Sequence, residues 1–160
     1  MILDERKKYM KPKLSAIEKF FSATAYAVIG ASEDRKKFGN IVFRSMKERG
    51  MVVYPVNPYR ESVEGCRCYA SIRDLPDGVS SVVTLTHPAA TESIIHDIAK
   101  KKIDSLWMQP GSDSKIARDE AEANGITVLC GQCILMFLEP VASVHSVHRF
   151  INKMVGAYPR

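Results

Sequence analysis

The sequence contains no long hydrophobic run. Its 160 residues are 46% hydrophobic and 26% charged, but no stretch approaches the roughly 20 apolar residues that span a bilayer. The N-terminal residues 1–8 also lack the apolar centre of a signal peptide. We therefore expect a cytoplasmic protein without a membrane partner, folded as one ordinary globular domain.

Cysteine is scarce as well. The chain has four, Cys66, Cys68, Cys130 and Cys133, and a cytoplasmic domain of this size more often keeps such thiols reduced than pairs them. Cys130 and Cys133 have Cys-x-x-Cys spacing, but in redox enzymes that motif begins a helix after an early strand. Cys66 and Cys68 are too close together for a zinc ribbon. We expect reduced thiols and no metal.

Acidic residues are outnumbered. The chain has 18 of them against 23 lysines and arginines, and its formal net charge is +5. A positive charge favours an anionic partner through long-range attraction. The richest basic cluster, Arg6 to Lys13, falls in the segment 1–13, which we interpret as a solvated tail in preference to a nucleic-acid arm. The expected partner is a small anionic molecule, not nucleic acid.

Strand-like apolar runs alternate with helical patterns along residues 14–160. The expected elements are helices from 14 and near 39–49, 88–101 and 113–124, strands near 25–30, 51–56, 80–86, 104–108 and 126–130, a small strand near 66–69, and a final helix from 140. Continuously apolar strands are typical of parallel sheets covered on both faces. The pattern predicts an α/β fold, a single Rossmann-like doubly wound parallel sheet with flanking helices.

Local signals predict several boundaries. Gly50 and Gly125 stand where left-handed residues would end two helices. Pro88 suits a first helical turn, and Asp113 is a favourable N-cap. The helix that begins at Leu14 is expected to pack against the edge of the sheet.

The first two expected strands end differently. The first leads into Gly30, Ala31 and Ser32 and then a helix. Such a turn builds a phosphate cradle, because glycine lets backbone N–H groups approach an anion and a helix N-terminus is partially positive. The second ends at Asn57 and Pro58, where an NAD site needs an acid for the ribose hydroxyls. Asn57 tolerates a phosphate on the ribose, so the sequence predicts a phosphorylated nucleotide other than NAD.

Catalytic groups are missing from the strand ends. Ser32 has neither a histidine at readable spacing nor a nucleophile elbow around it. His145 and His148 lie one helical turn apart, but no carboxylate completes a metal site with them in the sequence. The expected loops therefore favour binding over catalysis.

Four motifs carry a family resemblance. Gly30-Ala31-Ser32, Pro55-Val56-Asn57-Pro58, Thr86-His87-Pro88 and Leu106-Trp107-Met108-Gln109-Pro110-Gly111 follow four successive expected strands. In this order they resemble the small stand-alone CoA-binding proteins, whose fold is similar to the CoA-binding domain of succinyl-CoA synthetase. The resemblance implies a non-catalytic protein that holds coenzyme A, or an acyl-CoA, at the carboxyl ends of a parallel sheet.

The resemblance also implies which residues contact CoA. The first loop would hold the pyrophosphate. Independently of the resemblance, the charge of three phosphate groups predicts that nearby cations also contact the ligand. The second strand end would line the adenosine side, the third would border the nucleotide, and the fourth would lie nearer the pantetheine arm. The predicted contacts are Gly30, Ala31, Ser32, Arg35, Lys37, Phe38, Asn40, Val56, Asn57, Pro58, Arg60, Thr86, His87, Pro88, Gln109, Gly111 and Cys133.

Two other functions stay open at this point. Asn57 would also suit an NADP-dependent oxidoreductase, which would need a Tyr or Lys proton donor facing the nicotinamide. Alternatively, Cys133 could form a mixed disulfide with the CoA thiol in a redox-responsive protein. An apolar stripe on the final helix would permit a homodimer, and a CoA-binding protein could serve a partner acyl-CoA enzyme.

Overall fold

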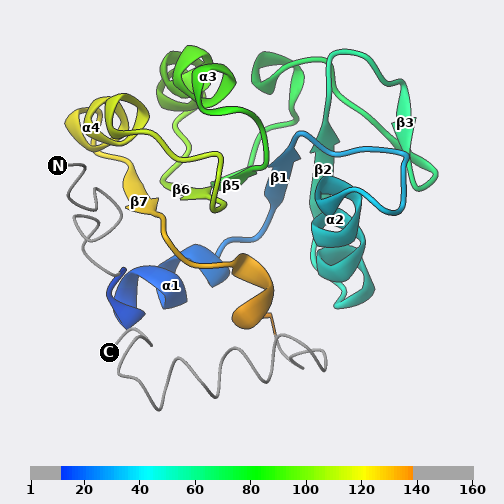
Figure 1. Ribbon diagram of the computed structural model, residues 1–160, viewed down its shortest axis with the longest axis horizontal. Coiled ribbons are helices and arrows are strands. Elements are labelled where there is room, and N and C mark those ends of the chain that lie inside the picture. The colour runs from blue at the N-terminus through cyan, green and yellow to red at the C-terminus, as the bar shows by residue number, and fades with distance from the viewer. Residues whose placement is uncertain (1–11, 139–160) are drawn as a thin grey trace, which may run out of the picture.

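The structure, a computed structural model, describes residues 12–138 (Figure 1). Its main sheet has five parallel strands in the order β2-β1-β5-β6-β7. These strands are β1 (Tyr26–Ile29), β2 (Val53–Val56), β5 (Ser81–Thr84), β6 (Ser105–Met108) and β7 (Thr127–Leu129). The chain runs outward from β1 to β2 and then crosses back to β5, so the strand order reverses between β1 and β5. This topology confirms the predicted α/β class.

Helices cover both faces of the sheet (Figure 1). One face packs against α1 (Leu14–Phe21), α2 (Phe38–Glu48) and the short 3-10 helix η3 (Ile134–Met136). The other packs against α3 (Pro88–Lys100), α4 (Lys115–Ala123) and the 3-10 helix η2 (Ile72–Asp74). Every residue of β1, β5 and β6 is buried, as expected for strands with two covered faces. The fold is therefore doubly wound.

Helix α1 lies elsewhere than predicted. The expectation that it would pack against the sheet edge is wrong, because the helix rests on the face of the sheet. The ring of its fully buried Phe20 lies 5.3 Å from that of Trp107 and 5.7 Å from that of Tyr26. Ser81 Oγ also donates a hydrogen bond of 3.1 Å to the Phe20 carbonyl. This aromatic packing holds α1 in place and makes the fully buried Trp107 part of the core.

Three predicted helix boundaries are confirmed. Gly50 and Gly125 follow α2 and α4, each with a φ of +76°, a backbone conformation that glycine adopts without steric cost. Pro88 is the first residue of α3, where its missing N–H has no intrahelical partner to lose.

The predicted N-cap Asp113 is wrong by one position. Ser114 caps α4, because its Oγ accepts a hydrogen bond of 2.9 Å from the backbone N–H of Ala117. Asp113 instead accepts a hydrogen bond of 3.0 Å from the backbone N–H of Gly111. Asp113 thus stabilises the loop that leads from β6 to α4.

A small hairpin projects between β2 and β5. It pairs β3 (Ser62–Val63) with β4 (Cys66–Arg67) in antiparallel register. Its turn residues Glu64 and Gly65 have φ values of +48° and +72°, the positive values that let a two-residue turn match the twist of a hairpin. The hairpin confirms the extra strand predicted near 66–69, although its partner β3 was not predicted.

Parts of the prediction fall beyond the described residues. The basic tail lies there except for its last two residues, and the final helix with its apolar stripe, which includes His145 and His148, lies there entirely. Among residues 12–138, no helix is long and apolar enough to cross a membrane.

Candidate nucleotide-binding site

The carboxyl ends of β1, β5 and β6 border a cavity of about 460 Å³. Its lining residues are Gly30, Lys37, Phe38, Gly39, Leu85, Thr86, His87, Gln109, Pro110, Gly111 and Ser112. The cavity thus lies where the strand order reverses, the place where open α/β sheets bind ligands. The structure brings together residues from three of the four sequence motifs here, with the start of α2.

Two glycines let helix α2 approach the end of β1. Gly30 has a φ of +88°. A Cβ added to Gly39 would lie only 2.1 Å from the Gly30 carbonyl oxygen, a clash with backbone. The side chain of the N-cap residue Lys37 makes no capping hydrogen bond, and the Asn40 N–H donates to the Lys37 carbonyl. The N–H groups of Phe38 and Gly39 are therefore the ones left for solvent or an anion. Gly39 was not among the predicted contacts, although a glycine in the first turn of this helix was visible in the sequence.

The loop after β1, residues 30–37, is held in shape by two asparagines. Asn57 Nδ2 donates to the Ala31 carbonyl at 2.7 Å, and Asn40 Nδ2 donates to the Ser32 carbonyl at 2.8 Å. Asn40 is completely buried. Both side chains were predicted to contact the ligand, but their hydrogen bonds shape the loop that would hold it.

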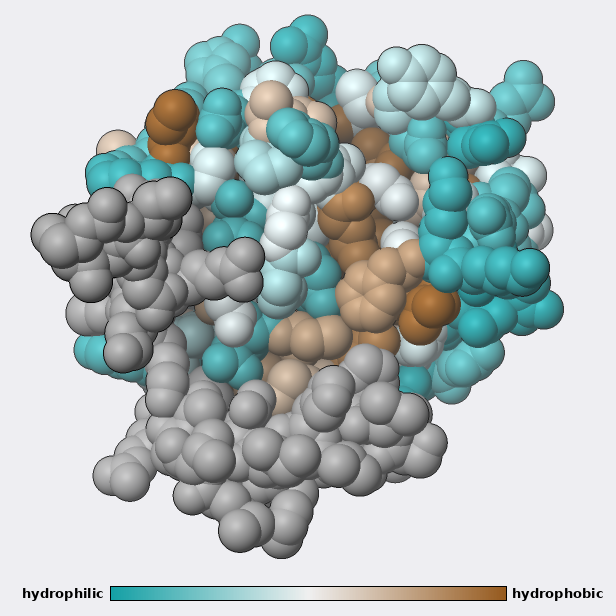
Figure 2. Space-filling view, in the orientation of Figure 1, coloured by the Kyte–Doolittle hydropathy of each residue, from teal (hydrophilic) through white to brown (hydrophobic). Residues whose placement is uncertain are grey.

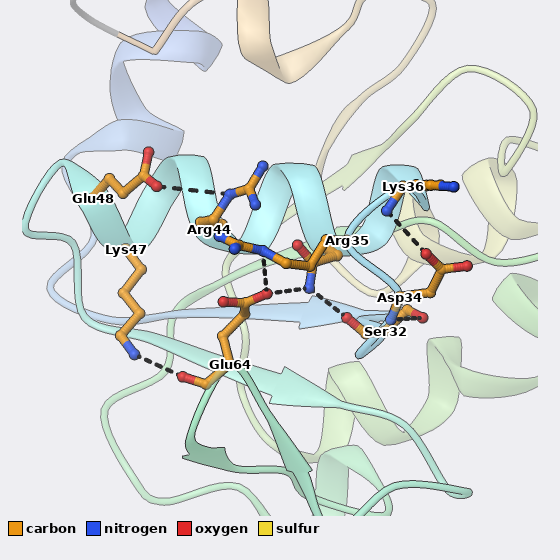
Figure 3. Close-up of polar contacts among 9 residues, drawn as sticks. Ser32, Asp34, Arg35, Lys36, Arg44, Lys47, Glu48 and Glu64 are labelled. Atoms are coloured by element: carbon orange, nitrogen blue, oxygen red, sulfur yellow. Dashed lines mark hydrogen bonds and ion pairs between the residues drawn. The ribbon is translucent and has the colours of Figure 1, made fainter.

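Ser32 and Arg35 also have partners within the protein. Ser32 is 8% exposed, and its Oγ accepts a hydrogen bond of 3.1 Å from the backbone N–H of Asp34. The Nε of Arg35 lies 3.1 Å from Oε1 of Glu64 on the hairpin (Figure 3). Of the predicted cations, Lys37 lines the cavity, whereas Arg35 forms an ion pair with Glu64.

Glu64 itself was missed by the sequence analysis. Its pKa is lowered chiefly by the hydrogen bond from Asn40, and further by the positive charges of Arg35, Arg44 and Lys47. The carboxylate is therefore ionised over the whole neutral range. Nothing in the local sequence indicates that a glutamate at a hairpin turn reaches the loop after β1.

A chain of hydroxyl groups lies behind the cavity. Ser112 Oγ donates to Thr84 Oγ1 at 2.9 Å, the Thr91 and Ser112 hydroxyls lie 2.8 Å apart, and those of Thr86 and Thr91 lie 3.1 Å apart. Each hydroxyl has only one hydrogen to donate. The hydroxyl hydrogen of Ser112 goes to Thr84. The Thr91 hydroxyl therefore donates to Ser112, and the Thr86 hydroxyl donates to Thr91. Thr86, which lines the cavity, is left as a hydrogen-bond acceptor only.

Gln109 connects the cavity to Cys133. Its Nε2 lies 3.0 Å from the Cys133 Sγ and donates to it, and its Oε1 accepts a hydrogen bond of 3.1 Å from the backbone N–H of Ile134. Burial raises the pKa of the Cys133 thiol, and hydrogen bonds to the sulfur offset this only in part. Cys133 therefore remains protonated at neutral pH and lies behind Gln109, outside the cavity lining.

The rim of the cavity combines an aromatic ring with a helix start. Phe38 is 39% exposed, and hydrophobic side chains reach the surface over the region of β1 and α2, with hydrophilic side chains around them (Figure 2). His87 Nδ1 accepts a hydrogen bond of 3.4 Å from the backbone N–H of Ala89 at the start of α3. Pro88 follows as the first residue of that helix, so it supports the rim without lining the cavity.

A second hollow, of about 660 Å³, lies beyond the end of β2. Its lining residues are Pro58, Tyr59, Arg60, Glu61, Arg67, Cys68, Tyr69, Ala70 and Asp74. Two of the predicted contacts, Pro58 and Arg60, line this hollow and not the main cavity. The Arg67 guanidinium lies 5.1 Å from the centre of the Tyr69 ring, so the hollow has a basic and aromatic wall.

Metal chemistry has no candidate in the described part of the chain. Residues 12–138 contain no group of three or more His, Cys, Asp or Glu side chains that could hold an ion. All four cysteines are unpaired by disulfides.

A doubly wound parallel sheet with a glycine-lined crevice at its reversal point defines a Rossmann-like nucleotide-binding protein. Residues 24–139 match the family described as the CoA binding domain, and the chain belongs to that family. The resemblance seen in the sequence is thereby confirmed.

Related proteins occur both as stand-alone domains and as parts of ligases. The chain is 34% identical over 88 residues to the alpha subunit of ADP-forming acetate–CoA ligase II from Pyrococcus furiosus, a match that covers 54% of this chain but only 19% of that subunit. A solved hypothetical protein from Pyrococcus horikoshii superposes with a TM-score of 0.75 at 27% identity, over 83% of this chain and 98% of that protein. A conserved hypothetical protein from Pyrococcus furiosus gives 0.66 at 32% identity, over 70% and 96%. The chain is thus a small homologue of one domain of such ligases.

Proposed function

We propose that the protein binds coenzyme A, free or acylated, and has no chemistry of its own. The observation that carries this proposal is the contact between Gly39 and Gly30, which brings the start of α2 to the cavity edge. Backbone N–H groups and the helix dipole would there meet the pyrophosphate. The side chain of Lys37, which also lines the cavity, would add a full positive charge.

The remaining contacts would follow the two ends of the ligand. The pantetheine arm would run past Gln109 and Gly111 in the main cavity. The adenosine end would pass Val56 and Asn57 toward the second hollow, where Arg60 could meet the 3′-phosphate. The loop residues between these ends would contribute backbone groups more than side chains.

The lining of the main cavity supports binding without catalysis. Its titratable side chains are those of Lys37 and His87, and His87 already accepts a hydrogen bond at the start of α3. The raised pKa of Cys133 disfavours attack on a disulfide, because the thiolate is the reactive form. A partner acyl-CoA enzyme or a second copy of the chain would then supply any chemistry.

Calorimetric titration with CoA, dephospho-CoA, NADP and NAD tests this function. We expect CoA to bind most tightly, dephospho-CoA more weakly for want of the 3′-phosphate contact, and NAD least. Tighter binding of NADP than of CoA would favour the oxidoreductase instead.

A further inference from the structure

The tip of the β3–β4 hairpin reaches the loop after β1 through one carboxylate (Figure 3). Glu64 Oε1 accepts a hydrogen bond of 2.8 Å from Asn40 Nδ2 and lies 3.1 Å from the Nε of Arg35. Asn40 belongs to the first turn of α2 and Arg35 to the loop. One oxygen atom therefore joins the hairpin, the helix and the loop.

The amide of Asn40 can adopt only one orientation here. Its two N–H hydrogens go to the Ser32 carbonyl and to Glu64. Its Oδ1 is buried without a hydrogen-bond partner within the described part of the chain. Rotating the amide by 180° would turn this oxygen toward two acceptors, which is worse than leaving it unpaired. Glu64 and the Ser32 carbonyl together hold the amide in place.

The position of Glu64 is itself fixed by backbone contacts. Its φ of +48° is the left-handed conformation that the hairpin turn requires. Lys47, on α2, donates from Nζ to the Glu64 carbonyl at 3.3 Å (Figure 3). The hairpin tip is thus attached to α2 through both the backbone and the side chain of Glu64.

We propose that Glu64 is a positioning residue for the phosphate-binding loop, acting through Asn40 on Ser32. The proposal rests on the proposed function, because the loop matters only if it holds a phosphate. Glu64 is not among the residues that line the cavity. It orients the amide that holds the loop carbonyl, so that the loop keeps its shape before the ligand arrives.

The sign of the effect separates this role from simple electrostatics. A carboxylate near an anionic ligand repels it, so on charge alone the removal of Glu64 would tighten CoA binding. A positioning role predicts the reverse, because loss of the hydrogen bond to Asn40 loosens the loop.

The first test compares Glu64→Ala with Glu64→Gln in calorimetric titrations with CoA. We expect Glu64→Ala to weaken binding about tenfold, the value of one hydrogen bond to a charged group. Glu64→Gln keeps the acceptor oxygen and should bind within about threefold of the wild type. Glu48→Ala is the control, since Glu48 pairs with Arg44 on α2 but does not reach the loop (Figure 3); it should leave binding unchanged.

The second test needs no ligand. In hydrogen exchange followed by mass spectrometry, amides of residues 31–37 should exchange faster in Glu64→Ala than in the wild type, and Glu64→Gln should restore the protection. The proposal is overturned if Glu64→Ala leaves this exchange unchanged, binds CoA as tightly as the wild type, or is matched in its loss by Glu64→Gln. Should the wild type not bind CoA, the proposed function fails, and the exchange experiment alone decides the role of Glu64.

Discussion

Gly39 has no side chain, yet its position sets the distance between helix α2 and the end of β1. The space that a Cβ would need is occupied by the Gly30 carbonyl, 2.1 Å away. Backbone cannot yield there as a flexible side chain would. The close approach of α2 to the end of β1 therefore requires glycine at position 39.

Gly39→Ala should abolish the cradle while leaving the rest of the fold. Alanine would gain about 1 kcal/mol of helix propensity, but the clash must displace the start of α2, so we expect CoA affinity to fall by about tenfold or more. Gly78→Ala is the control for a glycine substitution as such: it strains a residue with a φ of +91°, but its Cβ would meet nothing within 4 Å. Titration calorimetry of both variants measures the difference; equal CoA affinity in Gly39→Ala and the wild type would contradict the close-approach argument.

The buried hydroxyl chain makes a prediction about stability. Thr91→Val removes the central hydroxyl, so that Thr86 loses its acceptor and Ser112 loses a donor, although Ser112 still donates to Thr84. We expect a loss of about 1 kcal/mol in the free energy of unfolding, the typical net contribution of a hydrogen bond. Urea denaturation measures it. Thr91→Ser keeps the hydroxyl and should lose less; a larger loss for serine than for valine would show that methyl packing, not hydrogen bonding, matters at this site.

The raised pKa of Cys133 predicts how stability and thiol reactivity depend on pH. Because burial raises the pKa of its thiol above the ordinary value of 9.0, the folded state binds this proton more tightly than the unfolded state does. Its contribution to stability is therefore complete below that ordinary value and is lost as the pH rises through the raised one. Alkylation by iodoacetamide, followed by peptide mass spectrometry, should show Cys133 reacting only at higher pH than glutathione. Rapid alkylation of Cys133 at neutral pH would instead favour the mixed-disulfide function.

At the scale of elements, helices and strands could be predicted because their signals are local. Continuous apolar runs marked the strands, and Gly50, Gly125 and Pro88 marked helix ends through backbone conformations that depend on the residue itself. The placement of α1 could not be predicted in this way. It depends on rings that meet only in the folded chain, such as Phe20 and Trp107.

The same distinction holds for the site. Strand ends pointed to Gly30, Thr86 and Gln109, because parallel strands bring their carboxyl ends to one edge. The role of Asn57 could not be deduced, since its contact with the Ala31 carbonyl joins two separate loops. No sequence pattern indicated the position of Glu64, because residues with a side chain rarely adopt its φ of +48°.

The N-cap of α4 offers a prediction at this scale. Ser114 and Asp113 are adjacent residues of types that favour N-caps, but only Ser114 bonds to the first turn. Ser114→Ala should therefore lower the free energy of unfolding by about 1 kcal/mol. Asp113→Ala, the matched control, loses only a loop hydrogen bond and should cost less. Thermal or chemical denaturation of the two variants gives the order, and the reverse order would mean that the cap is misassigned.

At the scale of the whole molecule, the reversal of strand order matters most. It separates the loops after β1 and β5, so that a cavity opens between them at the carboxyl edge of the sheet. The second hollow beyond β2 lies next along the same edge. A ligand with a phosphate-bearing centre and two dissimilar ends suits this arrangement.

The relation to the ligases places the chain in a wider context. The match covers only 19% of the Pyrococcus furiosus ligase subunit, whereas the stand-alone homologues are covered nearly completely. The region that matches this chain is thus a small part of the ligase subunit and nearly the whole of the stand-alone homologues.

The most direct measurement of the central claim is a CoA titration followed by amide chemical shifts in an NMR spectrum of the labelled protein. The account predicts that the largest shifts fall on the loop after β1 and the start of α2, centred on Gly30, Ser32 and Gly39, with smaller ones at Thr86 and Gly111. CoA binding that leaves these amides unchanged, or no binding at all, would contradict it.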